Sequence, residues 1–543
     1  MTQTRQEKDS LGVVDVPAGA MYGAQTARAV ENFPISGMRA SKFLIRAIGM
    51  VKQAAAEANG ELGAISEERA RAIAAAAEEV VAGKWDAEFV VDVFQAGAGV
   101  SFHMNANEVV ANRANQILAG FKVRGSGFEE GARGEAEAKA DSSAALRNDK
   151  SKLRNDKAED KCGGPSTAAA APPSLGMTAS GGETTTAPSL GMTASVEALE
   201  RAALGRYEWV HPNDHVNFGQ STNDVFPTAM RVGTLLALKE LYPVLATLGG
   251  SFAAKGREFD GVLKAGRTHM QDAVPVRLGQ EFAAYGVAIA KAKVSIARAA
   301  DSLRELGLGG SAVGTGVNTV AGYRERAIAK LADLADEKLF PAQDMRWAMQ
   351  SCAPMAEVSA ALRGPALEVI RISNDLRLLS SGPNTGLNEI VLPSLQPGSS
   401  IMPGKVNPVL PELAAMVAFQ VIGNDVAVAM AVQAGQLELN VMMPTMASNV
   451  LQSITILTNM LRELDHRCVR GITANEARCA FYAQSTVALA TALNPYIGYA
   501  KAAEIVKESV ATGRSVIEFA REKNLLSESQ IAEILDPRRM TGD

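Results

Sequence analysis

The chain has 543 residues, of which 47% are hydrophobic, 21% charged and 5% aromatic, and its formal net charge is −5. This composition is typical of a large soluble globular protein with a substantial core, and the lack of a basic excess argues against nucleic acid as a partner. The polar residues 1–15 contain no apolar signal core. The four cysteines form no Cys-x-x-Cys pair and no zinc-type spacing with histidine, so we expect free thiols and a cytoplasmic location.

Helices dominate the elements predicted from the first third of the chain. Residues 5–37 are turn-rich and predicted to be irregular, whereas residues 40–83 predict two helices, the second rich in alanine. The segment 94–108 follows, and Gly97 and Gly99 in it let backbone amides approach a ligand closely. A glycine-rich start of the next helix, without any ligand, is the alternative interpretation.

Residues 125–204 differ in kind from the rest of the chain. They lack isoleucine and, beyond Phe128, any aromatic residue. They also contain two internal repeats, Leu-Arg-Asn-Asp-Lys at 146–150 and 153–157 and Pro-Ser-Leu-Gly-Met-Thr-Ala-Ser at 173–180 and 188–195. Such a composition buries too little apolar surface to offset the ordering of the chain. We predict a disordered insertion, and a partner-binding arm is the alternative.

Two polar segments then precede long apolar helices. Ser221, Thr222 and Asn223 come before a helix predicted at about 225–255, and Thr268 and His269 come before one predicted at 278–306. Ser, Thr and Asn commonly cap helices, but one such residue is enough for a cap, so three in a row suggest ligand contacts as well. A lone histidine is often structural, and that interpretation of His269 stays open. The glycine-rich residues 307–318 lack the Lys-Ser/Thr ending of a phosphate loop and predict a break between helices.

The segment 396–408, Gln-Pro-Gly-Ser-Ser-Ile-Met-Pro-Gly-Lys-Val-Asn-Pro, combines two glycines and three prolines and therefore predicts a shaped loop. Its two hydroxyls, one ammonium and one amide can bind a carboxylate. The predicted helices that follow or surround it span 325–336, 351–380, 411–435 and 445–472. The longest uncharged window, 439–461, contains Pro444 and four amide side chains, which favours a buried bundle helix over a membrane span.

The string Gly-Ser-Ser-x-Met-Pro-x-Lys-x-Asn-Pro resembles the signature of the aspartase/fumarase superfamily, and segments 94–108, 211–224 and 266–272 resemble its other substrate-binding segments. The resemblance implies a mainly α, three-domain fold whose central long-helix bundle forms a homotetramer, with each site built from three subunits. It covers nearly the whole chain outside the insertion. The implied division is an N-terminal lyase domain at 1–218, a central bundle at 219–474 and a small C-terminal helical domain at 475–543.

The resemblance also implies the roles of individual residues in an anti elimination from a small dicarboxylate substrate. Ser399 is the expected general base, and Glu412 is expected to pair with a catalytic His269. The expected substrate-binding residues are Ser221, Thr222, Asn223, Thr268, Ser400, Lys405 and Asn407, and a secondary anion site comprises His211, Asn213 and Asp214. No metal cluster or dinucleotide motif is present in the sequence, so no metal or cofactor is expected, and positioned donors must stabilise the aci-carboxylate intermediate.

Several short segments favour elimination of ammonia from L-aspartate over elimination of water from L-malate. Ala98, Thr222 and the segments 377–383, 435–441 and 471–475 resemble aspartases more than fumarases. Val100 stands where the family usually has threonine, so one hydroxyl is missing, and Phe102 and His103 are also unusual. Aspartate ammonia-lyase activity is therefore expected first, with fumarate hydratase and an inactive scaffold as alternatives.

Overall fold

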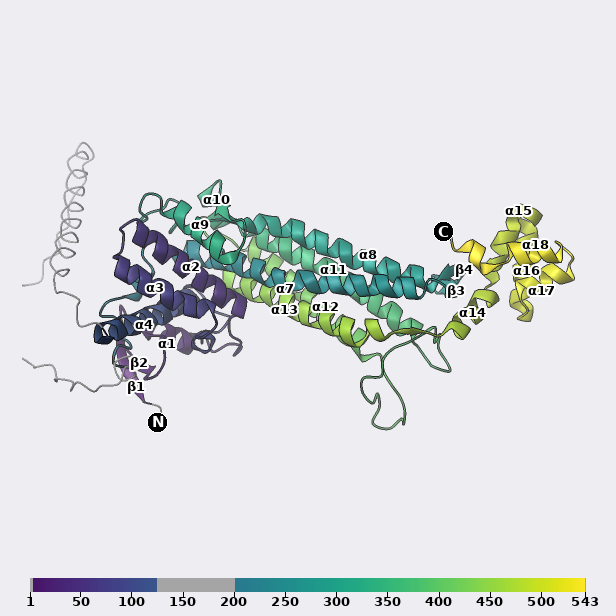
Figure 1. Cartoon of the computed structure of the whole chain (residues 1–543), viewed down its shortest axis with the longest axis horizontal. Coiled ribbons are helices and arrows are strands. Elements are labelled where there is room, and N and C mark those ends of the chain that lie inside the picture. The colour runs from purple at the N-terminus through teal and green to yellow at the C-terminus, as the bar shows by residue number, and fades with distance from the viewer. Residues whose placement is uncertain (1–2, 125–200, 543) are drawn as a thin grey trace, which may run out of the picture. The chain divides into compact units, whose positions relative to one another are not determined.

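The computed structural model describes residues 3–124 and 201–542, and most of them are helical (Figure 1). Within this part, the residues up to 114 and from 207 onward form one compact unit. The mainly helical prediction is confirmed. The longer helices are α2 (Lys42–Glu61), α3 (Glu67–Val81), α4 (Val100–Arg124), α7 (Thr222–Glu258), α8 (Leu278–Ala300), α9 (Tyr323–Ala335), α11 (Ala353–Leu379), α12 (Val409–Gln433) and α13 (Met443–Arg467).

The shorter elements connect and flank these helices. The short helices are α1 (Ala24–Asn32), α10 (Met345–Gln350), α14 (Glu476–Ser485), α15 (Asn494–Ile497), α16 (Tyr499–Thr512), α17 (Val516–Glu522) and α18 (Glu528–Ile534). Short stretches of tighter or wider helix are η1 (Asp86–Glu88), η3 (Pro212–Val216), η4 (Asp301–Arg304), η5 (Val469–Gly471), η6 (Val487–Leu493) and η7 (Pro537–Met540). Four two-stranded sheets pair β1 (Thr4–Asp9) with β2 (Gly12–Pro17), β3 (Leu263–Thr268) with β4 (Gln271–Arg277), β5 (Glu305–Leu306) with β6 (Phe340–Pro341), and β7 (Ile390–Val391) with β8 (Thr473–Ala474).

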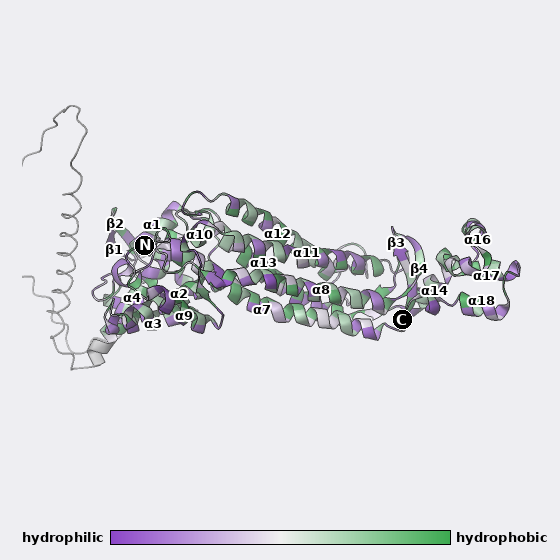
Figure 2. Ribbon diagram, turned by 90° about the horizontal axis from the view of Figure 1, so that it is seen from above, coloured by the Kyte–Doolittle hydropathy of each residue, from purple (hydrophilic) through white to green (hydrophobic). Residues whose placement is uncertain are grey.

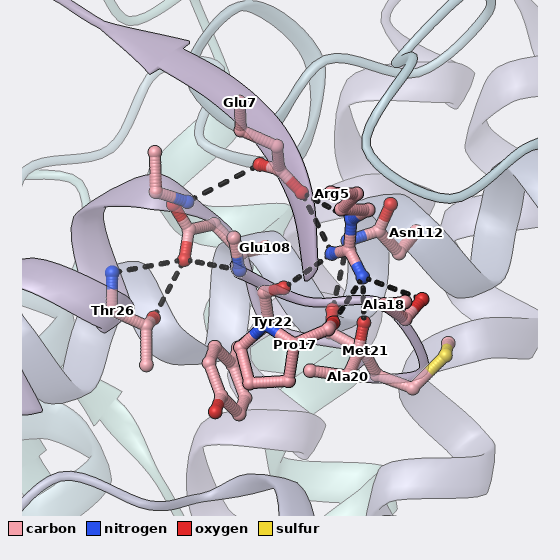
Figure 3. A network of polar contacts seen from close by, with 12 residues as sticks. Arg5, Glu7, Pro17, Ala18, Ala20, Met21, Tyr22, Thr26, Glu108 and Asn112 are labelled. Atoms are coloured by element: carbon pink, nitrogen blue, oxygen red, sulfur yellow. Dashed lines mark hydrogen bonds and ion pairs between the residues drawn. The ribbon is translucent and has the colours of Figure 1, made fainter. Parts of the chain in front are cut away.

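The N-terminal segment is ordered, contrary to the irregular structure predicted for residues 5–37. Strands β1 and β2 form an antiparallel hairpin, and α1 follows them. The carboxylate of Glu108 on α4 holds this segment in place, because it accepts hydrogen bonds from the backbone amides of Gly23, Gln25 and Thr26 and from the Thr26 hydroxyl (Figure 3). Burial raises the pKa of Glu108, and these donors oppose that rise.

Helices α7, α8, α11, α12 and α13 pack into one bundle, along which hydrophobic residues recur (Figure 2). Helices α7 and α8 approach each other at glycines. A Cβ added to Gly279 would lie 2.2 Å from the carbonyl oxygen of Gly256, and one added to Gly286 would lie 2.9 Å from that of Gly249. Only glycine fits at these two positions, because any side chain would collide with the facing backbone. The glycines therefore allow α7 and α8 to cross at this close distance.

Helix α12 carries large apolar side chains that the single chain leaves exposed, namely Leu413, Met416, Phe419, Val426 and Met430. By length and composition alone α7 and α12 could each cross a membrane. Within the chain, however, 56% of the apolar 18-residue stretch of α7 and 39% of that of α12 are already buried. The window predicted as a bundle helix from 439 to 461 lies in α13 from Met443 onward, and α13 packs on α7, α11 and α12.

The C-terminal helices enclose a small hydrophobic core of their own, with Leu489, Leu493, Ile505, Phe519 and Ile531 at its centre. The boundaries of the three predicted domains stay predictions. Most of the predicted insertion, residues 125–200, lies outside the described residues, and so does Cys162. At its end, however, Ala203 and Leu204 are buried, so the disorder predicted for 125–204 does not extend to these two residues. The cysteines Cys352, Cys468 and Cys479 are free and buried.

Candidate active site

The first two candidate segments meet at the start of α7. Gly97, Ala98 and Gly99 all have positive φ angles, of 82°, 56° and 94°, and they turn the chain into α4. A Cβ on Gly99 would lie 2.3 Å from the ring of Phe226 on α7, so glycine is required where the two helix starts touch. Val100 at the start of α4 is 41% exposed beside this contact.

The three polar residues at the start of α7 are each held by a specific partner. The Ser221 hydroxyl accepts a hydrogen bond from the Asn223 amide and, with Asp224, forms a capping box. The Asn223 side chain donates to the carbonyl of Ala312 over 2.9 Å. The Thr222 hydroxyl lies 2.7 Å from Nδ1 of His103. Ser221 therefore caps α7, whereas the ligand contacts expected of Ser221, Thr222 and Asn223 stay a prediction.

Behind Thr222 lies a buried polar cluster that sequence reasoning missed. His103 and Lys52 are 1% and 0% exposed, and Nε2 of His103 lies 2.6 Å from the Lys52 ammonium nitrogen. Lys52 also donates to the side-chain oxygens of Asn217 and Gln220, at 3.2 and 2.8 Å. The sequence feature that could have revealed this cluster is Lys52 itself. It lies on the inner face of the apolar helix α2, and a buried lysine needs hydrogen-bonding partners.

The predicted secondary anion site falls on one wide helical turn, η3. His211 caps this turn by accepting from the Asp214 amide, and its Nδ1 also lies 3.1 Å from the Asp214 carboxylate. Asn213 lies within the same turn. Five-residue helical turns of this kind often occur at functional sites. The structure brings the three residues together, and their binding role stays a prediction.

The third segment forms a hairpin that the sequence did not predict. Thr268 and His269 lie at the tip of β3 and β4, where His269 and Met270 have φ angles of 55° and 62°. Two successive positive φ angles define a tight two-residue turn whose twist matches the paired strands. The side chains of Thr268 and His269 are consequently displayed to solvent.

A buried ion cluster anchors the base of this hairpin. Glu389 is fully buried, and its carboxylate forms ion pairs with Arg267 at 2.9 Å and with Lys264 at 3.5 Å. Lys264 also pairs with Glu281 on α8 at 2.9 Å. Arg267 directly precedes Thr268, so the cluster sets the direction in which the tip projects.

The fourth segment is a loop closed at its neck and leads into α12. The amide of Gly398 donates to the carbonyl of Lys405 over 2.7 Å, and the Asn407 side chain donates to the carbonyl of Gly398 over 2.8 Å. Inside the loop, the Ser399 hydroxyl oxygen accepts hydrogen bonds from the amides of Ile401 and Met402, at 3.2 and 3.0 Å. Two amide donors aimed at one oxygen stabilise negative charge on it.

The other functional groups of the loop face outward. Ser400 and Lys405 are exposed, and Ser399, Asn407 and Glu412 are half-buried. No ion pair joins His269 to Glu412 within the part of the chain that the structure describes. The expected pairing of these two residues therefore stays a prediction.

One chain does not bring all four segments together. Helix α7 has 37 residues and is therefore about 55 Å long, with Thr222 at its start and the hairpin of His269 just beyond its end (Figure 1). The hairpin lies at the same end of the bundle as the loop of Ser399. Arg267 in the hairpin binds Glu389, which directly precedes β7 and the Ser399 loop. Strand β7 in turn pairs with β8, which follows the end of α13. The chain thus presents two half-sites at opposite ends of the bundle.

Comparisons with known proteins show which family the chain resembles. A family model described as lyase matches residues 12–127 and 180–423, leaving 128–179 unmatched, and a model of the fumarase C C-terminus matches 489–542. The aspartate ammonia-lyase of Pseudomonas canavaninivorans is 41% identical, covering 99% of this chain and 96% of that protein. The class II fumarate hydratase of Halobacterium salinarum is 43% identical, with coverages of 99% and 97%.

A solved structure extends the comparison to three dimensions. The fumarate lyase/delta crystallin of Brucella melitensis superposes with a TM-score of 0.81 at 40% identity, covering all of both chains. The helical bundle and the four segments thus define a lyase. More specifically, the chain belongs to the aspartase/fumarase superfamily, and the resemblance noted in the sequence is confirmed.

Proposed function

We propose that this protein is an aspartate ammonia-lyase, which eliminates ammonia from L-aspartate to give fumarate. The main structural support is the Ser399 hydroxyl, whose oxygen accepts hydrogen bonds from two backbone amides inside a closed loop. A serine is a weak base unless its alkoxide is stabilised, and these amides provide that stabilisation. The choice of ammonia as leaving group is supported by full-length relatives named aspartate ammonia-lyase at about 40% identity.

In the proposed reaction, the Ser399 alkoxide takes a proton from C3 of aspartate, next to the side-chain carboxylate. The electron pair of the broken C–H bond is first held as a doubly charged aci-carboxylate. It then forms the C2–C3 double bond as the C2–N bond breaks, and ammonia leaves from the former ammonium group. Lys405, Asn407 and Ser400 are suited to stabilise the aci-carboxylate, since they offer one ammonium, one amide and one hydroxyl.

We further propose that the working unit is a homotetramer in the cytoplasm, with each site assembled from several copies. Two observations support this. The half-sites of one chain are separated by the length of α7, about 55 Å, so each must be completed by another chain. The apolar face of α12 is also exposed in the single chain, and helices of a second copy would cover it.

Fumarate hydratase activity is the second candidate, because a fumarate hydratase is as similar to this chain as the ammonia-lyases are. A direct test offers the purified protein L-aspartate and L-malate separately and follows both ammonia and the absorbance of the double bond of fumarate. Ammonia formed together with fumarate supports the proposal. Fumarate formed rapidly from L-malate, with no ammonia from L-aspartate, would select the second candidate.

A further inference from the structure

The cluster behind Thr222 joins two basic side chains, Lys52 and His103, whose nitrogens lie so close that two positive charges would repel each other. Burial and the neighbouring Lys52 lower the pKa of His103 well below its usual range, so we place the positive charge on Lys52. The surroundings agree with this assignment. Three acceptors face the Lys52 nitrogen: Nε2 of His103 and the side-chain oxygens of Asn217 and Gln220. An ammonium group has three donors and matches them one to one.

The orientation of the two amides is fixed independently of Lys52. The Asn217 side-chain nitrogen donates to the carbonyl of Gln220 over 3.3 Å, and the Gln220 side-chain nitrogen donates to the carbonyl of Val216 over 2.9 Å. Their oxygens are therefore left for Lys52. With all three ammonium hydrogens assigned, Nε2 of His103 must accept, and its proton resides on Nδ1.

The protonated Nδ1 of His103 then donates to the Thr222 hydroxyl oxygen, 2.7 Å away. Because that oxygen already accepts a bond from the imidazole, the hydrogen of Thr222 is available to another partner. Thr222 is half-buried, and its partner His103 lies in the first turn of α4, three residues after the exposed Val100. A hydroxyl held in this way acts as a donor and matches a carboxylate, which only accepts hydrogen bonds.

We propose that Lys52 and His103 are positioning residues that hold the Thr222 hydroxyl as a hydrogen-bond donor to a substrate carboxylate. The inference rests on the proposed function, since it concerns how that dicarboxylate is oriented. It assigns a carboxylate of the substrate, and not its ammonium group, to Thr222. Neither Lys52 nor His103 touches the substrate.

The charged groups around the cluster make this arrangement dependent on pH. Burial lowers the pKa of Lys52 well below its usual range, while the nearby Asp224 carboxylate opposes that change. Asp224 is held by the amides of Ser221, Gly309 and Ser311, and the buried Tyr323 faces it. When rising pH removes a proton from Lys52, its neutral amine accepts a hydrogen bond from Nε2 of His103, whose proton now resides on Nε2. Nδ1 then accepts a hydrogen bond from the Thr222 hydroxyl, which can no longer donate to the ligand.

The first test measures the imidazole directly and needs no turnover. The ¹⁵N spectrum of the full-length protein labelled at its five histidines, with His103→Asn used to assign the signal, should show His103 as the neutral Nδ1–H form at pH 7. A neutral Nε2–H form or a charged imidazole would overturn the inference. This result is independent of whether L-aspartate is a substrate.

The second test uses succinate, an unreactive dicarboxylate, in a double-mutant cycle. Both His103→Leu and Thr222→Val should weaken succinate binding roughly tenfold or more, because one hydrogen bond to a charged group is lost. The double variant should be no weaker than Thr222→Val alone, since His103 acts only through Thr222. Additive losses would indicate a merely structural role and contradict the inference. Thr234→Val removes another α7 hydroxyl, one bonded to the Met230 carbonyl, and should leave binding unchanged.

The pH profile completes the test. Succinate binding by the wild type should weaken as pH rises through the lowered pKa of Lys52, whereas the affinity of Thr222→Val should not show this alkaline loss. His103→Asn places an amide near the position of Nδ1 and should retain most of the affinity without the alkaline loss. An identical loss of affinity at alkaline pH in Thr222→Val would contradict the inference. Failure of the wild type to bind succinate would count against the proposed function, and the ¹⁵N tautomer would then decide the inference alone.

Discussion

At the scale of single residues, the proposed elimination depends most on Ser399. Its oxygen accepts two amide hydrogen bonds inside the loop, a contact that favours the alkoxide but adds little to the packed core. Ser399→Ala should therefore reduce the turnover of L-aspartate by roughly 10²- to 10⁴-fold while leaving the melting temperature nearly unchanged. Steady-state kinetics beside a thermal melt would decide, with the exposed Ser394→Ala as control. Activity within a few-fold of the wild type would remove Ser399 from the role of base.

Val100 provides a gain-of-function prediction at the same scale. It is 41% exposed at the start of α4, three residues before His103, which contacts Thr222, and it lacks the hydroxyl that threonine would offer. Val100→Thr should lower KM for L-aspartate by about tenfold, because a hydrogen bond to a charged group contributes about 1.5–3 kcal/mol. An unchanged or higher KM in initial-rate measurements would show that position 100 does not face the substrate.

At the scale of elements, the hairpin of β3 and β4 depends on the buried carboxylate of Glu389. Glu389→Gln leaves Arg267 and Lys264 without their common counter-charge, and breaking a buried ion pair costs about 3–5 kcal/mol. We expect a lower midpoint in chemical denaturation and weaker catalysis, since the tip carrying His269 loses its anchor. The exposed pair of Arg514 and Glu522 offers a control, and Glu522→Gln should change stability by less than about 1 kcal/mol. Equal effects of the two substitutions would contradict the proposed anchor.

The predicted insertion is a second element open to test. The lyase family model leaves residues 128–179 unmatched, and the repeats at 146–157 and 173–195, most of which lie in this range, lack aromatic residues. Deleting residues 131–195 should leave melting temperature and activity close to those of the full chain. Loss of the oligomer or of activity on deletion would show that the segment is structural or functional.

The elements also show what the sequence alone could predict. The helix predicted at 411–435 is observed at Val409–Gln433, because long apolar runs identify helices well. Both hairpins were missed, since β1 and β2 lack clear alternation and the turn at His269 and Met270 lacks the usual Asn-Gly. Motifs located the four candidate segments. The contacts of Lys52 and Glu389 join residues far apart in the chain, and only the folded structure reveals them.

At the scale of the whole molecule, the proposed sharing of sites predicts complementation between inactive variants. Asn223→Asp places a negative charge in the half-site at the start of α7, and Ser399→Ala removes the proposed base from the half-site at the other end. Each variant should be nearly inactive alone. Unfolding and refolding a mixture should restore part of the activity, because some sites then combine an intact residue from each chain. No recovery in mixed oligomers confirmed by mass would contradict sites shared between chains.

A single assay on the purified protein can decide whether this chain eliminates ammonia from L-aspartate. The purified wild-type protein is given L-aspartate while ammonia and the absorbance of fumarate are followed together, with Ser399→Ala and L-malate as parallel controls. We expect equal amounts of ammonia and fumarate from L-aspartate, near-zero rates for Ser399→Ala, and much slower formation of fumarate from L-malate. Absence of ammonia from L-aspartate under conditions where L-malate is converted rapidly would contradict the proposed ammonia-lyase activity.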